Sequence, residues 1–129
     1  MSKSRKDDHI KLARMQDIKS NRFDDMILEG TDLPNLSMAD IDLSTTFLGN
    51  KIPYPIYINA MTGGSDEAYR INEFLAKIAN HFNIPMVTGS QSIIFKDPKA
   101  VASFEVIRTH HDGILVGNIN PNMTLKQAR

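Results

Sequence analysis

The segment Pro55-Ile56-Tyr57-Ile58-Asn59-Ala60-Met61-Thr62-Gly63-Gly64 indicates the fold class of this chain, because a short apolar run ends abruptly in a polar, glycine-rich turn. A helical pattern starts soon after it, near Glu67. Glycine allows the backbone to approach a ligand closely, and the first turn of the following helix offers free N–H groups. Since α/β proteins build phosphate and cofactor cradles in this way, the segment predicts such a cradle.

Two more strand-like runs follow along the chain, and each also ends in small polar residues. Strands and helices are expected to alternate over five segments, at residues 56–60, 67–81, 85–88, 98–110 and 114–117. Val87 lies 29 positions after Ile58 (87 − 58), and Val116 lies 29 positions after Val87 (116 − 87). Strand–helix units repeated at this interval predict parallel strands joined by right-handed crossovers.

The first of these helices is expected to pack one apolar stripe into the core. The stripe recurs at intervals of three and four residues, and its members are Ile71, Phe74, Leu75, Ile78 and Phe82. Ser65 or Asp66 can cap the start of this helix, and Asn83 is expected to end it. Asp97 followed by Pro98 predicts the start of the second helix.

In a parallel sheet all strands end on the same side. The residues that follow the three strands, 61–64, 90–91 and Asn118, are therefore expected to converge on one rim, where α/β proteins place their ligands. The predicted fold class is α/β, either a small open α/β protein or the leading portion of a (β/α)8 TIM barrel. A complete barrel of that type takes about 250 residues.

Two regions are expected along the chain. Residues 1–54 form an amino-terminal arm and lead-in segment, and residues 55–129 hold the first strand–helix units of a barrel, with about three parallel strands. Thr124 can cap a further helix, and the sequence stops at Arg129, barely one turn into it. That position favours the barrel over the small open protein.

The expected arm has little regular structure. Residues 1–15 carry only a partial apolar face, which suits a marginal helix, and residues 21–30 could form another short helix. Residues 44–48 favour a strand, and residues 49–51 favour a turn.

Composition excludes several classes of protein. The chain of 129 residues has 15 basic and 15 acidic side chains and a net charge of zero, which gives no support for a nucleic-acid or anionic-membrane surface. It has no cysteine, so disulfides, thiolate catalysis and Cys-ligated metal sites are excluded. With no transmembrane run and no signal peptide, cytoplasmic location is the default. His81, His110 and His111 fall near helix carboxyl ends, where structural roles are expected.

Four segments taken together resemble a known family. They are Arg5-Lys6-Asp7-Asp8-His9-Ile10, Ile58-Asn59-Ala60-Met61-Thr62-Gly63-Gly64, Thr88-Gly89-Ser90-Gln91 and Gly117-Asn118. At this separation they resemble the amino-terminal part of the type 2 isopentenyl-diphosphate isomerases, which are FMN-dependent (β/α)8-barrel enzymes. The resemblance runs over the whole chain, which corresponds to the first third of a family member.

The resemblance implies roles for individual residues. Arg5 and Lys6 would bind the substrate diphosphate, with His9 nearby and Gln91 close to the substrate. The FMN would lie against the ends of the three strands, at Ala60, Met61, Thr62, Gly63, Ser90 and Asn118. No catalytic residue and no metal ligand is assigned, because the family's magnesium carboxylate comes after Arg129.

The implied reaction is FMN- and magnesium-dependent isomerisation of isopentenyl diphosphate to dimethylallyl diphosphate in isoprenoid biosynthesis, with NADPH as reductant. Reduced flavin supplies the acid and base of the 1,3-proton shift, so the protein positions cofactor and substrate. Neutral Thr, Ser and Asn side chains suit the edges of a flavin, and the Arg5 guanidinium matches diphosphate oxygens. Ser92 stands where many members have arginine. The 129 residues alone are expected to be inactive.

Two alternatives stay open. Another FMN-dependent TIM-barrel oxidoreductase, acting on a 2-hydroxy acid or a nucleotide, would share the rim but would have no use for Arg5-Lys6. A non-catalytic oligomerising fragment would use its open sheet edges and uncovered helix stripe for self-association. A homo-oligomer is expected, with a small-molecule substrate and neither nucleic acid nor membrane as partner.

Overall fold

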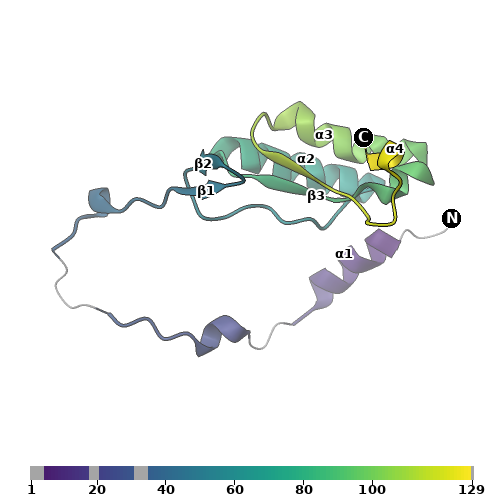
Figure 1. The fold of residues 1–129 in the computed structure, drawn as a ribbon. Helices are drawn as coiled ribbons and strands as arrows, with labels where there is room; N and C mark the ends of the chain where they lie inside the picture. The colour runs from purple at the N-terminus through teal and green to yellow at the C-terminus, as the bar shows by residue number, and fades with distance from the viewer. Residues whose placement is uncertain (1–4, 18–20, 31–34, 129) are drawn as a thin grey trace.

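The computed structural model describes residues 5–17, 21–30 and 35–128, which form an extended arm and a small α/β body (Figure 1). None of the helices in this described part is both long and apolar enough to cross a membrane. In chain order the elements, with 3-10 helices marked η, are α1 (Arg5–Met15), η1 (Arg22–Asp25), η2 (Met38–Asp40), β1 (Thr45–Phe47), β2 (Asn50–Ile52), α2 (Asp66–Phe82), β3 (Met86–Ser90), η3 (Gln91–Phe95), η4 (Pro98–Val101), α3 (Ala102–His110), β4 (Leu115–Asn118) and α4 (Leu125–Ala128).

β3 and β4 form a parallel pair, as the repeated spacing predicts. Val87 lies opposite Val116. After an irregularity in the register, Ser90 lies opposite Asn118. The crossover between the strands runs through η3, η4 and α3. The predicted adjacency and direction of the second and third strands are therefore confirmed, and closure of these units into a barrel stays a prediction.

The first predicted strand is present only as a parallel bridge at Ile58. Ile58 N–H donates to the Pro85 carbonyl at 2.9 Å, and Val87 N–H donates to the Ile58 carbonyl at 2.8 Å. Pro55 has no N–H to offer, which limits how far a ladder could extend toward the amino end. The strand therefore has the predicted place and direction but is shorter than the predicted range 56–60.

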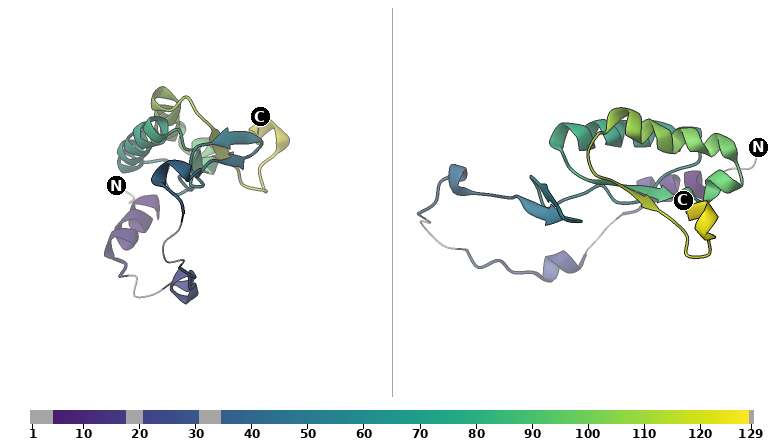
Figure 2. Two further views of the ribbon diagram at one scale, coloured as in Figure 1. Left: turned by 90° about the vertical axis from the view of Figure 1, so that its left-hand side faces the viewer. Right: turned by 45° about the horizontal axis from the view of Figure 1, so that its top comes forward.

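α2 and α3 lie side by side on one face of the β3–β4 pair (Figures 1 and 2). The hydrophobic core includes residues from both helices and from β3, and its buried members are Ala76, Ala79, Ile84, Met86, Val106 and Ile107. Ile58, Leu75 and Leu115 are partly buried and pack against this cluster. The body is thus a two-layer unit, which leaves the carboxyl ends of the strands at one edge.

The face that α2 buries differs from the predicted stripe. Its buried residues are mostly small, and they are Ala68, Asn72, Ala76 and Ala79. In the predicted stripe, Phe74 is 64% exposed and Phe82 is 49% exposed. The other stripe members are half-buried, Ile71, Leu75 and Ile78. Small side chains let α2 and α3 approach closely, so the large residues lie on a face that the described chain covers only in part.

The ends of the helices follow the local sequence signals. Ser65 Oγ accepts a hydrogen bond from Ala68 N–H at 3.2 Å and caps α2. Asn83 ends the same helix in the left-handed conformation, with φ at 51°. Asp97 caps the second helix as predicted, but the chain winds first as η4 and becomes α-helical only at Ala102. Such 3-10 turns are frequent at helix amino ends.

The arm departs from its predicted elements. α1 forms, whereas residues 21–30 contain only the short η1. The predicted turn at 49–51 is wrong for Asn50 and Lys51, which belong to β2, and β2 pairs antiparallel with β1 in a hairpin. Leu48 and Gly49 make its two-residue turn, with φ at 49° and 79°. Both φ values are positive, as a hairpin turn of this type requires, and leucine is an unusual residue for that conformation. Because Leu48 does not have the residue type of such a turn, the hairpin and β2 were not predicted.

Two of the histidines differ in environment. His110 Nε2 lies 3.5 Å from the Glu73 carboxylate, so it joins α3 to α2 at their exposed side. His111 is 1% exposed, and its Nε2 lies 3.2 Å from the Ile114 carbonyl. His111 is therefore a buried packing residue and not a surface cation at the helix end. Arg108 takes that place, and it donates to the His111 carbonyl at 3.2 Å.

Ile107→Ala should lower the free energy of unfolding of the 129-residue chain by about 2–5 kcal/mol, because the side chain is wholly buried. Phe74→Ala is the matched control, since it removes a larger but mainly exposed side chain and should cost less than about 1 kcal/mol. Urea unfolding followed by circular dichroism measures both. Equal losses would contradict the buried face described for α2.

Candidate functional site

The carboxyl ends of the three predicted strands meet at one rim. Ser90 at the end of β3 lies opposite Asn118 at the end of β4. The backbone of Gly89 packs against the turn 61–64, since a Cβ at Gly89 would lie 2.2 Å from the Thr62 carbonyl oxygen. The polar residues that follow the strands are therefore brought together, as their positions in the sequence predict.

A buried threonine links the polar residues of β3 and β4. Thr88, which is 2% exposed, accepts hydrogen bonds at Oγ1 from Asn118 N–H at 3.2 Å and from Gln91 Nε2 at 3.5 Å. Ser90 Oγ lies 3.2 Å from Ser92 Oγ. Ser90, Gln91 and Asn118 are half-buried. The rim thus offers neutral hydrogen-bonding groups whose positions are fixed by their neighbours.

The turn after the first strand is held from the side of the helices. Thr62 is 8% exposed, and its Oγ1 is hydrogen-bonded to Asn72 Oδ1 in α2. A Cβ at Gly63 would lie 2.3 Å from the ring of Phe104 in α3. The hydroxyl of Thr62 and the missing side chain of Gly63 therefore serve packing against the helices. Met61, by contrast, is 62% exposed.

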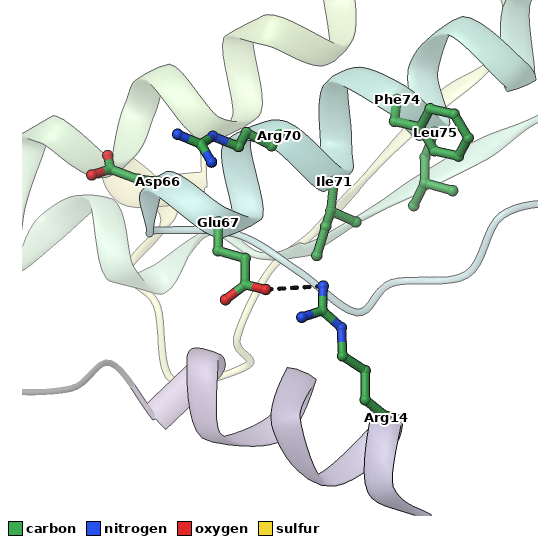
Figure 3. Close-up of a pocket in the computed structure, with 7 residues that line it drawn as sticks. All are labelled: Arg14, Asp66, Glu67, Arg70, Ile71, Phe74 and Leu75. Atoms are coloured by element: carbon green, nitrogen blue, oxygen red, sulfur yellow. Dashed lines mark ion pairs between the residues drawn. The ribbon is translucent and has the colours of Figure 1, made fainter.

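α1 is attached to the start of α2, directly after that turn. Ser65 Oγ donates a hydrogen bond to Asp7 Oδ1 at 2.6 Å. Arg14 and Glu67 form an ion pair at 3.0 Å, which Figure 3 shows between the two helices. The amino end of the arm, more than fifty residues away in sequence, therefore lies beside the rim.

The predicted diphosphate-binding cations belong to this helix. Arg5 and Lys6 lie in the first turn of α1, and their side chains lie outside the described part of the structure. His9 is exposed on the same helix. Because Asp7 contacts Ser65, the backbone at Arg5 and Lys6 lies near the turn 61–64.

A groove of about 590 Å³ lies between α1 and α2 (Figure 3). Apolar side chains of α2 and charged groups from both helices line it, namely Arg14, Asp66, Glu67, Arg70, Ile71, Phe74 and Leu75. None of the predicted site residues whose side chains are described is among them. The groove belongs to the partly uncovered outer face of α2 and is separate from the rim.

The chemistry of the rim suits the edge of a flat, polar ring. Ser90, Gln91 and Asn118 carry donors and acceptors without net charge, and Ala60 and Met61 add small and flexible apolar surface. Close packing of Gly89 against the turn leaves no side chain between the first two strand ends. These features fit the isoalloxazine of a flavin. Within residues 5–17, 21–30 and 35–128, no group of three or more His, Cys, Asp or Glu could hold a metal ion.

Sequence reasoning missed the residues that hold the rim from behind. Asn72 stands four residues after Ala68 and four before Ala76, on the buried face of α2. A polar residue spaced by four positions between two alanines is the one signal in the sequence that could have identified Asn72. Ser103 and Thr88 give no such signal, since a short hydroxyl side chain is common on any surface. Asp7, which ties the arm to the rim, gives no such signal either.

The chain is similar to three bacterial proteins named isopentenyl-diphosphate delta-isomerase. It is 41% identical to one from Listeria innocua over 127 residues, 42% to one from Latilactobacillus sakei over 128, and 43% to one from Limosilactobacillus reuteri over 129. The matches cover 96–97% of this chain but only 36–37% of each relative, so the chain spans little more than a third of their length. No protein-family profile matches the chain.

Gly89→Ala should destabilise the chain by about 1–3 kcal/mol, because the new methyl group would collide with the Thr62 carbonyl and force the backbone apart. Gly117→Ala is the matched control on the neighbouring strand, where a Cβ meets nothing closer than the Gln91 amide at 3.8 Å. It should be close to neutral. Thermal unfolding compares the two, and a neutral Gly89→Ala would show that the strand ends do not pack this closely.

Proposed function

We propose that this chain is part of an FMN- and magnesium-dependent enzyme that isomerises isopentenyl diphosphate to dimethylallyl diphosphate in isoprenoid biosynthesis. The isomerase names of the relatives support this assignment. The structural observation that carries it is the meeting of Ser90, Asn118 and the turn 61–64 at one rim beside α1. In the proposal, these strand–helix units are the first of a (β/α)8 barrel.

The flavin in this proposal lies across the three strand ends. Ser90 and Asn118 are neighbours through the pairing of β3 and β4, so both can hydrogen-bond one ring edge. Ala60 and Met61 follow the first strand and would contact the ring face or edge. Gln91, fixed at Thr88 beside them, would face the substrate. All of these groups are neutral, so they orient the ring without adding charge to it.

The diphosphate would be bound by the arm. Arg5 and Lys6 stand at the start of α1, whose next residue, Asp7, is hydrogen-bonded to Ser65 at the start of α2. A guanidinium offers paired donors to phosphate oxygens, and an ammonium adds a second positive charge. The arm would therefore place the charged end of the substrate at the edge of the rim, with its hydrocarbon end toward the flavin.

FMN, once reduced by NADPH, would supply the proton transfer of the redox-neutral 1,3-shift, and magnesium would neutralise charge on the diphosphate. The residues of this chain would bind and orient the flavin and the substrate. The packed turn 61–64 and the buried Thr88 would keep the rim rigid, and the half-buried Ser90 and Gln91 would limit the access of water. This division explains why the rim needs no acidic or basic side chain.

A second candidate is a non-catalytic oligomerising fragment, which the exposed apolar surface favours. Phe74 and Phe82 on α2 are 64% and 49% exposed, and in the arm Phe23, Ile27 and Leu28 are 79–91% exposed. Apolar area of this extent promotes association. Homo-oligomerisation is compatible with both candidates, and flavin binding separates them.

A hybrid in which residues 1–129 replace the matching residues of the Listeria innocua relative should convert isopentenyl diphosphate to dimethylallyl diphosphate with FMN, magnesium and NADPH. The 129-residue chain alone should not. Product is measured by chromatography of labelled substrate, with the unmodified relative as positive control and omission of FMN as negative control. A folded hybrid that binds FMN but instead oxidises a 2-hydroxy acid would favour the oxidoreductase alternative.

In the same hybrid, Arg5→Ala or Lys6→Ala should raise KM for isopentenyl diphosphate about 10- to 100-fold, because each would remove a charge-assisted contact to phosphate. FMN content should not change. Lys11→Ala is the control, since it removes an exposed cation about one and a half turns further along α1. An unaltered KM in both arm variants would reject the role of the arm, and loss of FMN would make the arm structural.

A further inference from the structure

A buried chain of hydrogen bonds ties the turn 61–64 to both helices. Thr62 Oγ1 is bonded to Asn72 Oδ1, and Asn72 Nδ2 donates to the Ser103 carbonyl at 2.7 Å. Gly64 N–H donates to Ser103 Oγ at 2.7 Å, and Ser103 Oγ in turn donates to the Ala100 carbonyl at 2.7 Å. The two ends of the chain thus fall on Thr62 and Gly64, on either side of Gly63.

The groups in this chain are almost fully removed from water. Thr62 is 8% exposed, Asn72 is 2% exposed and Ser103 is 3% exposed. With an oxygen of Asn72 as its partner, the hydroxyl of Thr62 is the donor, so its single proton points into the protein. A buried polar group that loses its partner is costly, which keeps this arrangement in place.

We propose that Asn72 and Ser103 are positioning residues that fix the turn 61–64 as one wall of the flavin site, so that Thr62 acts through its backbone and not through its hydroxyl. The proposal rests on the proposed function. Both side chains are buried, and they contact the turn at the Thr62 hydroxyl and the Gly64 N–H. Their effect on a ligand must pass through Thr62 and Gly64.

The turn is also packed on its other side, against β3, and this packing determines how a loss of the buried bonds would affect the site. The Thr62 carbonyl oxygen lies against the Gly89 backbone, where even a methyl group has no room. The turn is therefore confined between β3 in front and Asn72 with Ser103 behind. Release at the back would let the turn move away from Ser90 and widen the rim. A planar ligand that bridges the strand ends would then lose contacts it cannot regain.

A double-mutant cycle on FMN affinity tests the proposal. Thr62→Val removes the hydroxyl but keeps the shape, and Asn72→Leu keeps the volume but removes the amide. Each should weaken FMN binding about 5- to 50-fold, the equivalent of one buried hydrogen bond. The double variant should bind FMN no more weakly than the worse of the two single variants, since both substitutions break the same hydrogen bond between Thr62 and Asn72. Titration of FMN into the hybrid that carries residues 1–129, followed by flavin fluorescence, supplies the dissociation constants.

Two controls separate positioning from simple loss of stability. Thr62→Ser keeps the hydroxyl and should retain the affinity of the unmodified protein. Ser103→Ala removes the acceptor of Gly64 N–H, and should speed amide exchange at Gly64 while weakening FMN to a similar extent as Asn72→Leu. FMN affinities are compared at equal folded fraction, which urea unfolding determines for each variant. If Asn72 and Ser103 only stabilised the fold, the affinity of the folded variants would be unchanged.

Four results would overturn the proposal. If Thr62→Val weakened FMN binding while Asn72→Leu and Ser103→Ala did not, the Thr62 hydroxyl would contact the ligand directly. Additive losses in the double variant would mean two independent effects. Unmodified protein without FMN affinity would reject the proposed function and the positioning role together, whereas binding by the unmodified protein with no change in any folded variant would reject the positioning role alone.

Discussion

The close approach of the Gly89 backbone to the Thr62 carbonyl is the constraint on which the candidate site depends. With no room for a Cβ, β3 and the turn after the first strand lie backbone against backbone. Ser90 follows Gly89 directly, and the strand pairing then sets Asn118 opposite Ser90. One contact without side chains therefore places three strand ends together. Glycine loses more conformational freedom on folding than other residues, and the buried bonds at Asn72 offset this cost.

The arm is held far less firmly than the rim. Its two described links to α2 are the hydrogen bond from Ser65 to Asp7 and the ion pair of Arg14 with Glu67. The arginine side chain is 68% exposed, so the pair contributes about 0–1 kcal/mol. A rigid neutral rim and a weakly attached cationic helix suit different tasks. The rim can hold a ring in one orientation, while the helix can adjust as a charged group binds.

The sequence predicted what depends on local chemistry and on repetition. Ser65, Asn83 and Asp97 act at the helix ends as expected, and the spacing of 29 positions correctly indicated parallel strands (116 − 87). Prediction from the sequence failed where tertiary contacts determine which residues are buried or bonded. The apolar period of α2 could not reveal that the small face would be buried against α3, and nothing local foretold that Asp7 would reach Ser65. The hydrogen bond from Thr62 to Asn72 likewise joins segments ten residues apart.

The outer face of α2 bears on assembly and not on the chemistry of the rim. Three of its large apolar residues line the groove, Ile71, Phe74 and Leu75, and Phe74 is the most exposed of them. Burial of apolar surface contributes about 25 cal/mol per Å², so such a face favours coverage by another copy or, in the proposed barrel, by further strand–helix units. None of its residues is shared with the strand ends. Whatever covers this face therefore acts first on the stability of α2, and it reaches the proposed flavin site through Asn72 on the buried side of the same helix or through α1, which lines the groove at Arg14.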